Sequence, residues 1–232
     1  MSARRVVLLS PLLILSSMEY PSDASKASDG NSLTKFCNML DKLILLLDLG
    51  GVVFTSTGRD SPAIDWAVIT ELNYRYGHDL NVGKDVFPEF MRDYNRGTGL
   101  QLSGDRFLQD VFDTLEINWE LIDTLRQKNE LVIVSDNYRE NIAYIAARYR
   151  FADWAKRQIY SFDYELTKED PDFFRRLLTD LAPCRPENLL LLDDSPEKLA
   201  AAASVGIAGV LYQSNAQALR ELAGLGRVEP GA

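Results

Sequence analysis

The stretch that decides the fold is Leu43-Ile44-Leu45-Leu46-Leu47-Asp48-Leu49-Gly50-Gly51-Val52-Val53. The unbroken apolar run before Asp48 indicates a strand buried on both faces, as in a parallel sheet covered by helices. Such a sheet places its chemistry just beyond the carboxyl ends of its strands. Asp48 stands at that point and precedes two glycines that let the backbone come close. It is therefore a candidate nucleophile or metal ligand, and the alternative is an aspartate that only caps a turn.

The composition is that of an ordinary folded protein with an acidic charge. The chain has 232 residues, 46% of them hydrophobic and 25% charged, which suits one large domain or a domain with an insert. The net charge of −9 argues against a nucleic-acid partner. The two cysteines lack metal-ligand spacing, and the only histidine, His78, falls in a segment that reads as a polar loop. Carboxylates, lysine, serine and a hard metal ion are left to carry the chemistry.

Residues 1–42 differ from the rest of the chain and read as an N-terminal extension. Arg4 and Arg5 precede an apolar run from Val6 to Leu15, as in a signal peptide, although Pro11 interrupts that run. The run is shorter than the roughly 20 residues that a membrane span needs. A dispensable extension, a wrongly assigned start and an ordered element that packs on the domain are the alternatives. We predict a cytoplasmic protein, or a secreted or organellar one if the segment is a targeting signal.

The remaining pattern predicts an α/β fold with an insert after the first strand. Helical periodicity fills residues 59–126, with one helix ending at Gly77 and a loop at residues 95–99. Strands and helices then alternate, and the later strands end near Ser135, Phe162, Asp193 and Tyr212. We predict a Rossmann-like parallel sheet core from residues 43–58 and 127–226, an inserted α-helical cap from residues 59–126, and a tail at residues 227–232.

Three of the apolar strands end in polar residues that this sheet would bring together. They are Asp48, Ser135 and the pair Asp193-Asp194. Three clustered carboxylates raise one another's pKa unless a cation lies among them. Mg²⁺ suits such a site because it is a hard ion that prefers oxygen ligands.

Two further residues suit an anionic substrate. Lys168 follows the third strand of the core, where its ammonium would hold a phosphate oxygen, although it reads equally as a surface lysine. Ser135 precedes a helix, so its hydroxyl and the following amides would either bind a phosphate oxygen or cap that helix.

The order of these residues resembles the haloacid dehalogenase-like (HAD) hydrolase superfamily. The similarity extends from about Leu43 to Ala223, and the helical insert is similar to the superfamily's type 1 cap. Four motifs in order carry it: Asp48-Leu49-Gly50-Gly51-Val52-Val53, Ser135 after Leu131-Val132-Ile133-Val134, Lys168 in Thr167-Lys168-Glu169-Asp170, and Asp193-Asp194.

The resemblance implies a Mg²⁺-dependent phosphatase that hydrolyses a small phosphorylated metabolite. Asp48 would form an aspartyl-phosphate, which water then hydrolyses. The implied metal ligands are Asp48, the Gly50 carbonyl, Asp193 and Asp194. The implied phosphate-binding residues are Ser135, Asp136 and Lys168. The sequence makes no prediction of oligomeric state and shows no stable membrane span.

Gly50 is the departure from that pattern. Most phosphatases of the superfamily carry an aspartate there as general acid and base, which typically contributes about 10²–10⁴-fold. Three explanations are open. The substrate has a good leaving group, or Asp136, Ser195 or a water substitutes for the missing aspartate, or turnover is weak or absent. A subgroup with Asp-Leu-Gly in this motif includes sugar-phosphate phosphatases, which favours the first explanation. The alternative functions are a metal-independent dehalogenase and a non-catalytic module that binds phosphate or a partner.

Overall fold

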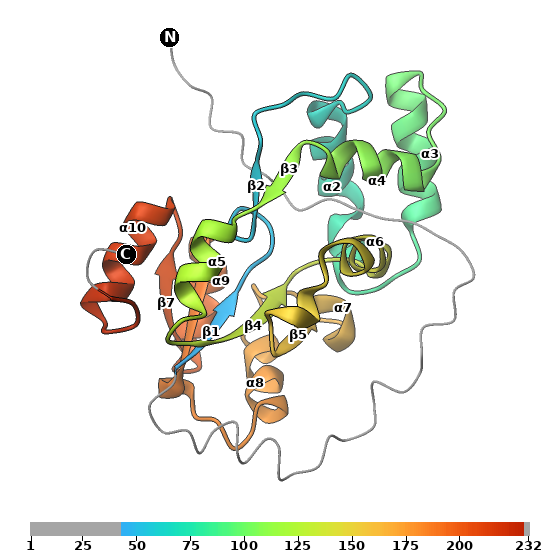
Figure 1. Cartoon of the computed structure of the whole chain (residues 1–232). Coiled ribbons are helices and arrows are strands. Elements are labelled where there is room, and N and C mark those ends of the chain that lie inside the picture. The colour runs from blue at the N-terminus through green and yellow to red at the C-terminus, as the bar shows by residue number, and fades with distance from the viewer. Residues whose placement is uncertain (1–42, 230–232) are drawn as a thin grey trace.

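The computed structural model describes residues 43–229, so the predictions for residues 1–42 fall outside it. A five-stranded sheet lies at its centre, in the order β5-β4-β1-β6-β7, and every neighbouring pair is parallel (Figure 1). The strands are β1 Ile44–Leu47, β4 Glu130–Ser135, β5 Arg157–Tyr160, β6 Leu189–Asp193 and β7 Ala208–Leu211. The predicted α/β fold with a Rossmann-like parallel sheet is confirmed.

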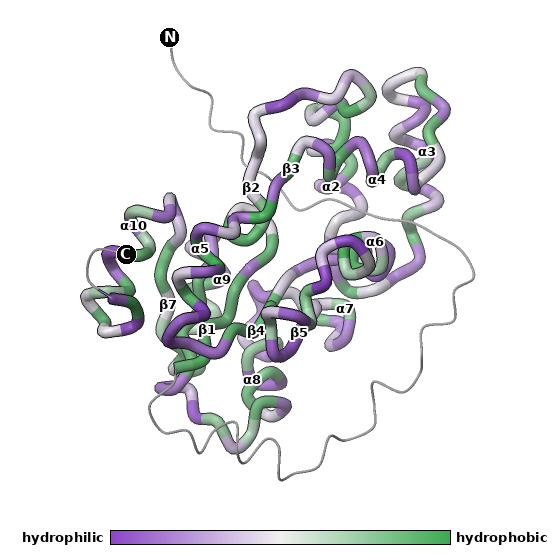
Figure 2. Tube along the Cα trace, viewed as in Figure 1, coloured by the Kyte–Doolittle hydropathy of each residue, from purple (hydrophilic) through white to green (hydrophobic). Residues whose placement is uncertain are grey.

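Helices cover both faces of this sheet, which explains why β1 has no polar residue. Leu45 and Leu47 point to a face covered by α5 (Trp119–Leu125), α6 (Arg139–Tyr149) and α10 (Asn215–Gly224). Ile44 and Leu46 point to the opposite face, which α8 (Pro171–Asp180) and α9 (Pro196–Ser204) cover. Figure 2 shows the hydrophobic colour concentrated on the central strands. Successive side chains alternate between faces, so a strand covered twice is apolar throughout.

The insert between β1 and β4 begins and ends with two short strands. β2 (Phe54–Ser56) pairs antiparallel with β3 (Leu115–Ile117), and α2 (Trp66–Asn81), α3 (Phe87–Thr98) and α4 (Gly104–Phe112) lie between them in sequence. Figure 1 shows these three helices on the far side of the strand pair from the parallel sheet. We did not predict β2 and β3, because three residues are too few to show an alternating pattern.

Two predictions inside the insert were wrong. Helix α2 continues through Gly77 to Asn81, so His78 lies in a helix rather than a loop. Helix α3 continues through residues 95–98 and ends before Gly99, which has a φ of 72°. A glycine inside a helix costs about 1 kcal/mol relative to alanine. At Gly97 it also permits close packing, because a Cβ there would lie 3.3 Å from the Val68 side chain of α2.

The remaining elements follow the predicted alternation closely. The strand predicted to reach Phe162 ends at Tyr160, and the short helix α7 (Ser161–Tyr164) follows it. Two 3-10 turns, η1 (Phe151–Asp153) and η2 (Pro186–Asn188), precede β5 and β6. Within residues 43–229, no helix is both long and apolar enough to cross a membrane.

Candidate active site

Asp48 follows the central strand of the sheet, at its carboxyl edge. Strand β1 lies between β4 and β6, and the Asp48 amide continues the pairing by donating to the Leu192 carbonyl at 3.1 Å. The residue is only 1% exposed, and its Oδ1 accepts a hydrogen bond from the Leu49 amide at 2.8 Å. The strand order therefore gives Asp48 neighbours from both flanking strands.

Three carboxylates meet at this edge. Each of Asp48, Asp193 and Asp194 offers an oxygen, and the three oxygens lie within 4.8 Å of one another. Asp48 and Asp193 are buried and Asp194 is exposed. Although the residue as a whole is exposed, partial desolvation of its carboxyl group and the charges of Asp48 and Asp193 raise the pKa of Asp194 to about 6. This repulsion is what a divalent cation would relieve, so the donor set fits the Mg²⁺ predicted from the sequence.

The glycine turn after Asp48 leaves room for this cluster. Gly51 has a φ of +74°, and a Cβ at this position would lie 2.3 Å from Oδ2 of Asp194. Any other residue would therefore strain the backbone and displace a carboxylate of the cluster. Gly50 is not among the residues with positive φ, so its backbone accepts a side chain without that strain.

Lys168 contacts both of the buried carboxylates. Its fully buried ammonium lies 2.9 Å from Asp48 Oδ1 and 2.6 Å from Asp193 Oδ2, and it also donates to the Val134 carbonyl at 3.0 Å. Burial alone would lower the pKa of Lys168, but Asp193 and Asp48 outweigh it and hold the pKa above its ordinary value. Burial would likewise raise the pKa of Asp193, and the two lysines Lys168 and Lys198 reverse that effect. Lys168 is thus not a surface lysine.

Ser135 ends the neighbouring strand β4 and Asp136 follows it, and both are buried. The Ser135 hydroxyl donates to the Asp136 carbonyl at 3.3 Å, and the N-cap of α6 is Tyr138, so Ser135 does not cap that helix. Asp136 Oδ1 accepts the Lys168 amide at 2.8 Å. The structure therefore brings Asp136 to the same group of charges as Asp48.

We did not predict Lys198, which also reaches these carboxylates. Its ammonium lies 3.3 Å from Asp136 Oδ2 and 3.9 Å from Asp48 Oδ2. The residue belongs to the first turn of α9, where its amide donates to the Ser195 hydroxyl at the N-cap. A lysine is unfavourable near the positive end of a helix dipole. This unfavourable placement is the sequence feature that could have indicated a functional role for Lys198.

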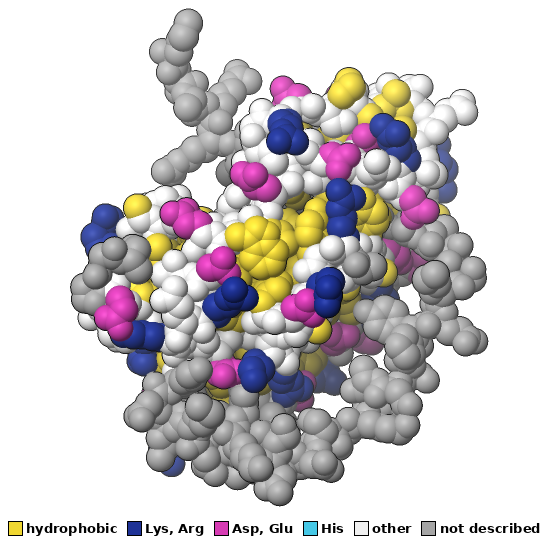
Figure 3. Space-filling view, in the orientation of Figure 1, with side chains coloured by type: hydrophobic (Ala, Val, Ile, Leu, Met, Phe, Trp, Pro, Cys, Tyr) yellow, Lys and Arg dark blue, Asp and Glu magenta, His cyan; other side chains and the backbone are white. Residues whose placement is uncertain are grey.

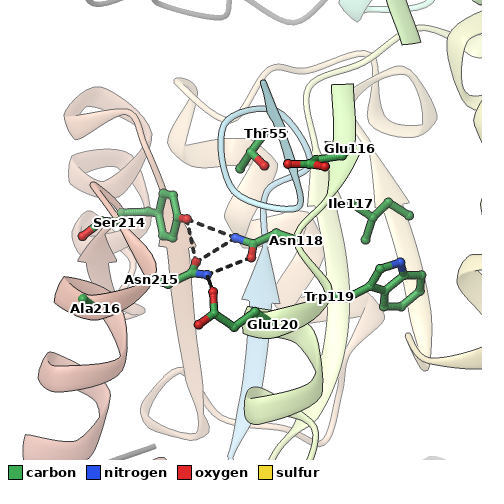
Figure 4. A pocket seen from close by; sticks show the side chains of 10 residues that line it. Thr55, Glu116, Ile117, Asn118, Trp119, Glu120, Ser214, Asn215 and Ala216 are labelled. Atoms are coloured by element: carbon green, nitrogen blue, oxygen red, sulfur yellow. Dashed lines mark hydrogen bonds between the residues drawn. The ribbon is translucent and has the colours of Figure 1, made fainter. Parts of the chain in front are cut away.

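A separate polar pocket lies where the strand pair β2–β3 meets β7 and α10. Figure 4 shows Asn118, Asn215 and Glu120 joined by hydrogen bonds, including Asn215 Nδ2 to Glu120 Oε2 at 2.6 Å. The Tyr212 hydroxyl also bonds to Asn118 and Asn215. The pocket holds ≈ 700 Å³, and none of its lining residues belongs to the Asp48 cluster. On the face shown in Figure 3, hydrophobic side chains gather among charged ones between the sheet and the insert. The hydrogen bonds around Asn118 and Asn215 connect the end of the insert, after β3, to the segment between β7 and α10.

No family model and no curated protein matches this chain. Several solved structures do. A HAD-like family hydrolase from Porphyromonas gingivalis is 23% identical with a TM-score of 0.62, and the match covers 82% of this chain and 100% of that one. A HAD family enzyme from Bacteroides thetaiotaomicron is 19% identical with a TM-score of 0.59, over 74% of this chain and 93% of that one.

A third similar structure is the putative HAD-hydrolase YfnB from Bacillus subtilis, bound to magnesium. It is 14% identical with a TM-score of 0.52, over 73% of this chain and 86% of that one. The Bacteroides enzyme has also been solved in complex with magnesium and inorganic phosphate. The chain therefore has the fold of the HAD hydrolases, as its motif order predicted.

Proposed function

We propose that this chain is a Mg²⁺-dependent phosphatase of a small phosphorylated metabolite, with Asp48 as the phosphoryl acceptor. The observation that carries the proposal is the position of Asp48. It belongs to an acidic cluster suited to a divalent cation, and it contacts the buried ammonium of Lys168. The magnesium and phosphate bound by the similar Bacteroides enzyme support this assignment.

We assign each site residue a role in binding. Asp48, the Gly50 carbonyl, Asp193 and Asp194 would hold Mg²⁺, which supplies positive charge to the oxygens of the transferring group. Ser135, Asp136 and Lys168 form the phosphate-binding side of the site, to which Lys168 contributes its positive charge. Lys168 opposes the burial that raises the pKa of Asp48, and it helps to hold the pKa of Asp193 below its ordinary value, since its ammonium contacts both carboxylates.

The reaction then has two steps. A carboxylate oxygen of Asp48 bonds to phosphorus while the bond to the leaving oxygen breaks, and the electron pair departs with that oxygen. Water next hydrolyses the aspartyl-phosphate, which releases inorganic phosphate and restores the Asp48 carboxylate. Leu49 and Lys168 both donate to Oδ1, which orients the carboxylate before the first step.

Gly50 favours a substrate whose leaving group needs little protonation, such as a sugar 1-phosphate. Asp136 and Ser195, the side chains that could replace the missing aspartate, already bind other partners. Asp136 accepts the Lys168 amide, and Ser195 donates its hydroxyl to Glu197 at 2.9 Å. An anomeric or acyl phosphate leaves without a strong general acid, which fits a site with glycine at this position.

A substrate panel tests the proposal with the purified full-length chain. We expect hydrolysis of sugar 1-phosphates and acyl phosphates with Mg²⁺, and its loss when EDTA removes the metal. Release of halide from a 2-haloacid that survives EDTA would instead identify a dehalogenase. Binding of inorganic phosphate without turnover of any panel member would identify a non-catalytic module.

A further inference from the structure

Two lysines face the Asp48 carboxylate, and they differ in what they already bind. Lys168 is fully buried, whereas the side chain of Lys198 is 14% exposed. Lys168 approaches Asp48 Oδ1 and Lys198 approaches Oδ2, so the two ammonium groups lie at different oxygens of the nucleophile. This difference bears on which of them meets an incoming phosphate.

Lys168 has no hydrogen left to offer a substrate in this arrangement. An ammonium carries three N–H donors. The three donors of Lys168 have acceptors within 3.0 Å, namely Asp48 Oδ1, Asp193 Oδ2 and the Val134 carbonyl. Its positive charge still acts on the site, but a direct bond to a phosphate oxygen would break one of these contacts.

Lys198 is less fully engaged. Its contact to Asp136 Oδ2 is 3.3 Å long, and its separation from Asp48 Oδ2, 3.9 Å, exceeds hydrogen-bond distance. Its helix begins at Pro196, directly after the acidic pair, so the backbone holds Lys198 close to the cluster. The four carboxylates Asp48, Asp136, Asp193 and Asp194 outnumber the two lysines, so the site needs each positive charge to accept an anion.

We propose that Lys198 is a substrate-binding residue that donates directly to an oxygen of the transferring phosphoryl group, while Lys168 holds the nucleophile. The inference rests on the proposed function and deepens it. Lys198, whose side chain is the more exposed of the two lysines, then supplies a positive charge near Asp48 Oδ2.

Phosphate binding measured apart from turnover tests this assignment. We would titrate the full-length chain, with Mg²⁺ present, with inorganic phosphate in a calorimeter. Loss of a charged hydrogen bond predicts a dissociation constant roughly 10- to 100-fold weaker in Lys198→Met. Lys198→Arg should recover most of the affinity. Lys128→Met is the matched control. Lys128 precedes β4, so it lies at the amino ends of the parallel strands, opposite to Asp48, and it pairs with Glu229.

A second measurement needs no variant and covers the case in which Lys198→Met does not fold. In the wild-type chain, phosphate with Mg²⁺ should shift the ¹⁵N resonance of the Lys198 ammonium in NMR and should leave that of Lys128 unchanged. Wild-type phosphate affinity in Lys198→Met, or a Lys198 ammonium resonance that phosphate does not shift, would overturn the inference. A chain that binds phosphate through Lys198 but hydrolyses no ester would overturn only the proposed phosphatase activity.

Discussion

Replacing Gly51 by alanine should separate the function of the acidic cluster from the stability of the fold. At this position φ is +74°, and the new Cβ would lie 2.3 Å from Asp194 Oδ2. A left-handed backbone costs a non-glycine residue roughly 1–2 kcal/mol. Asp194 Oδ2 would also have to move by about 1 Å, since ordinary contact begins at 3.4 Å. A misplacement of that size can cost about 10²-fold in rate.

Gly58 offers the matched control. Its φ is +72°, and nothing lies within 4 Å of the position that a Cβ would occupy. Gly58→Ala therefore carries the same backbone strain without the clash. The Asp194 side chain is exposed and can swing away, so both variants should lose similar free energies of unfolding. Only Gly51→Ala should lose Mg²⁺ affinity and phosphatase activity.

Denaturant unfolding, calorimetric Mg²⁺ titration and aryl phosphate hydrolysis check these expectations. We expect both variants to be destabilised by about 1–2 kcal/mol. We expect Gly51→Ala alone to lose activity, by about 10²-fold. Wild-type Mg²⁺ affinity and activity in Gly51→Ala, or an equal loss of both in Gly58→Ala, would refute the reasoning.

Three other predictions follow from the same geometry. Lys168→Met leaves two buried carboxylates without their cation, so the free energy of unfolding, measured by denaturant titration, should fall by about 3–5 kcal/mol. Unchanged stability would show that the Lys168 ammonium does not pair with these carboxylates. The pKa of Asp194 is raised to about 6 without metal, so a proton competes with Mg²⁺ for this carboxylate below that pH. The Mg²⁺ affinity should therefore weaken about tenfold per pH unit as the pH falls below 6. Calorimetry that finds constant Mg²⁺ affinity down to about pH 5 would exclude Asp194 as a ligand. Gly50→Asp should speed the hydrolysis of alkyl phosphates more than that of sugar 1-phosphates, because the alkoxide is the poorer leaving group and needs a general acid. Equal rate changes for both substrates would count against the leaving-group explanation of Gly50.

The sheet and its strand ends were predictable because apolar runs mark doubly covered strands. Asp48, Ser135 and Asp193 stand at the ends of such runs, and the parallel topology then brings them to one edge. Long-range charge pairing was not predictable. Lys198 was missed because its one local signal, a lysine in the first turn of a helix, does not show that this turn of α9 lies close to Asp48. The continuation of α3 through Gly97 was missed because it depends on packing against Val68, which belongs to another helix.

Acid-quenched trapping of the phosphoenzyme tests the central claim most directly. The wild-type chain would be mixed with Mg²⁺ and acetyl phosphate, digested, and searched for a phosphorylated peptide by mass spectrometry. Asp48→Asn, with unchanged circular dichroism, is the control. We expect a phosphoryl group on Asp48 that disappears with EDTA and in the variant. Phosphate release by the variant at the wild-type rate, or a phosphoryl group on another residue, would contradict the account.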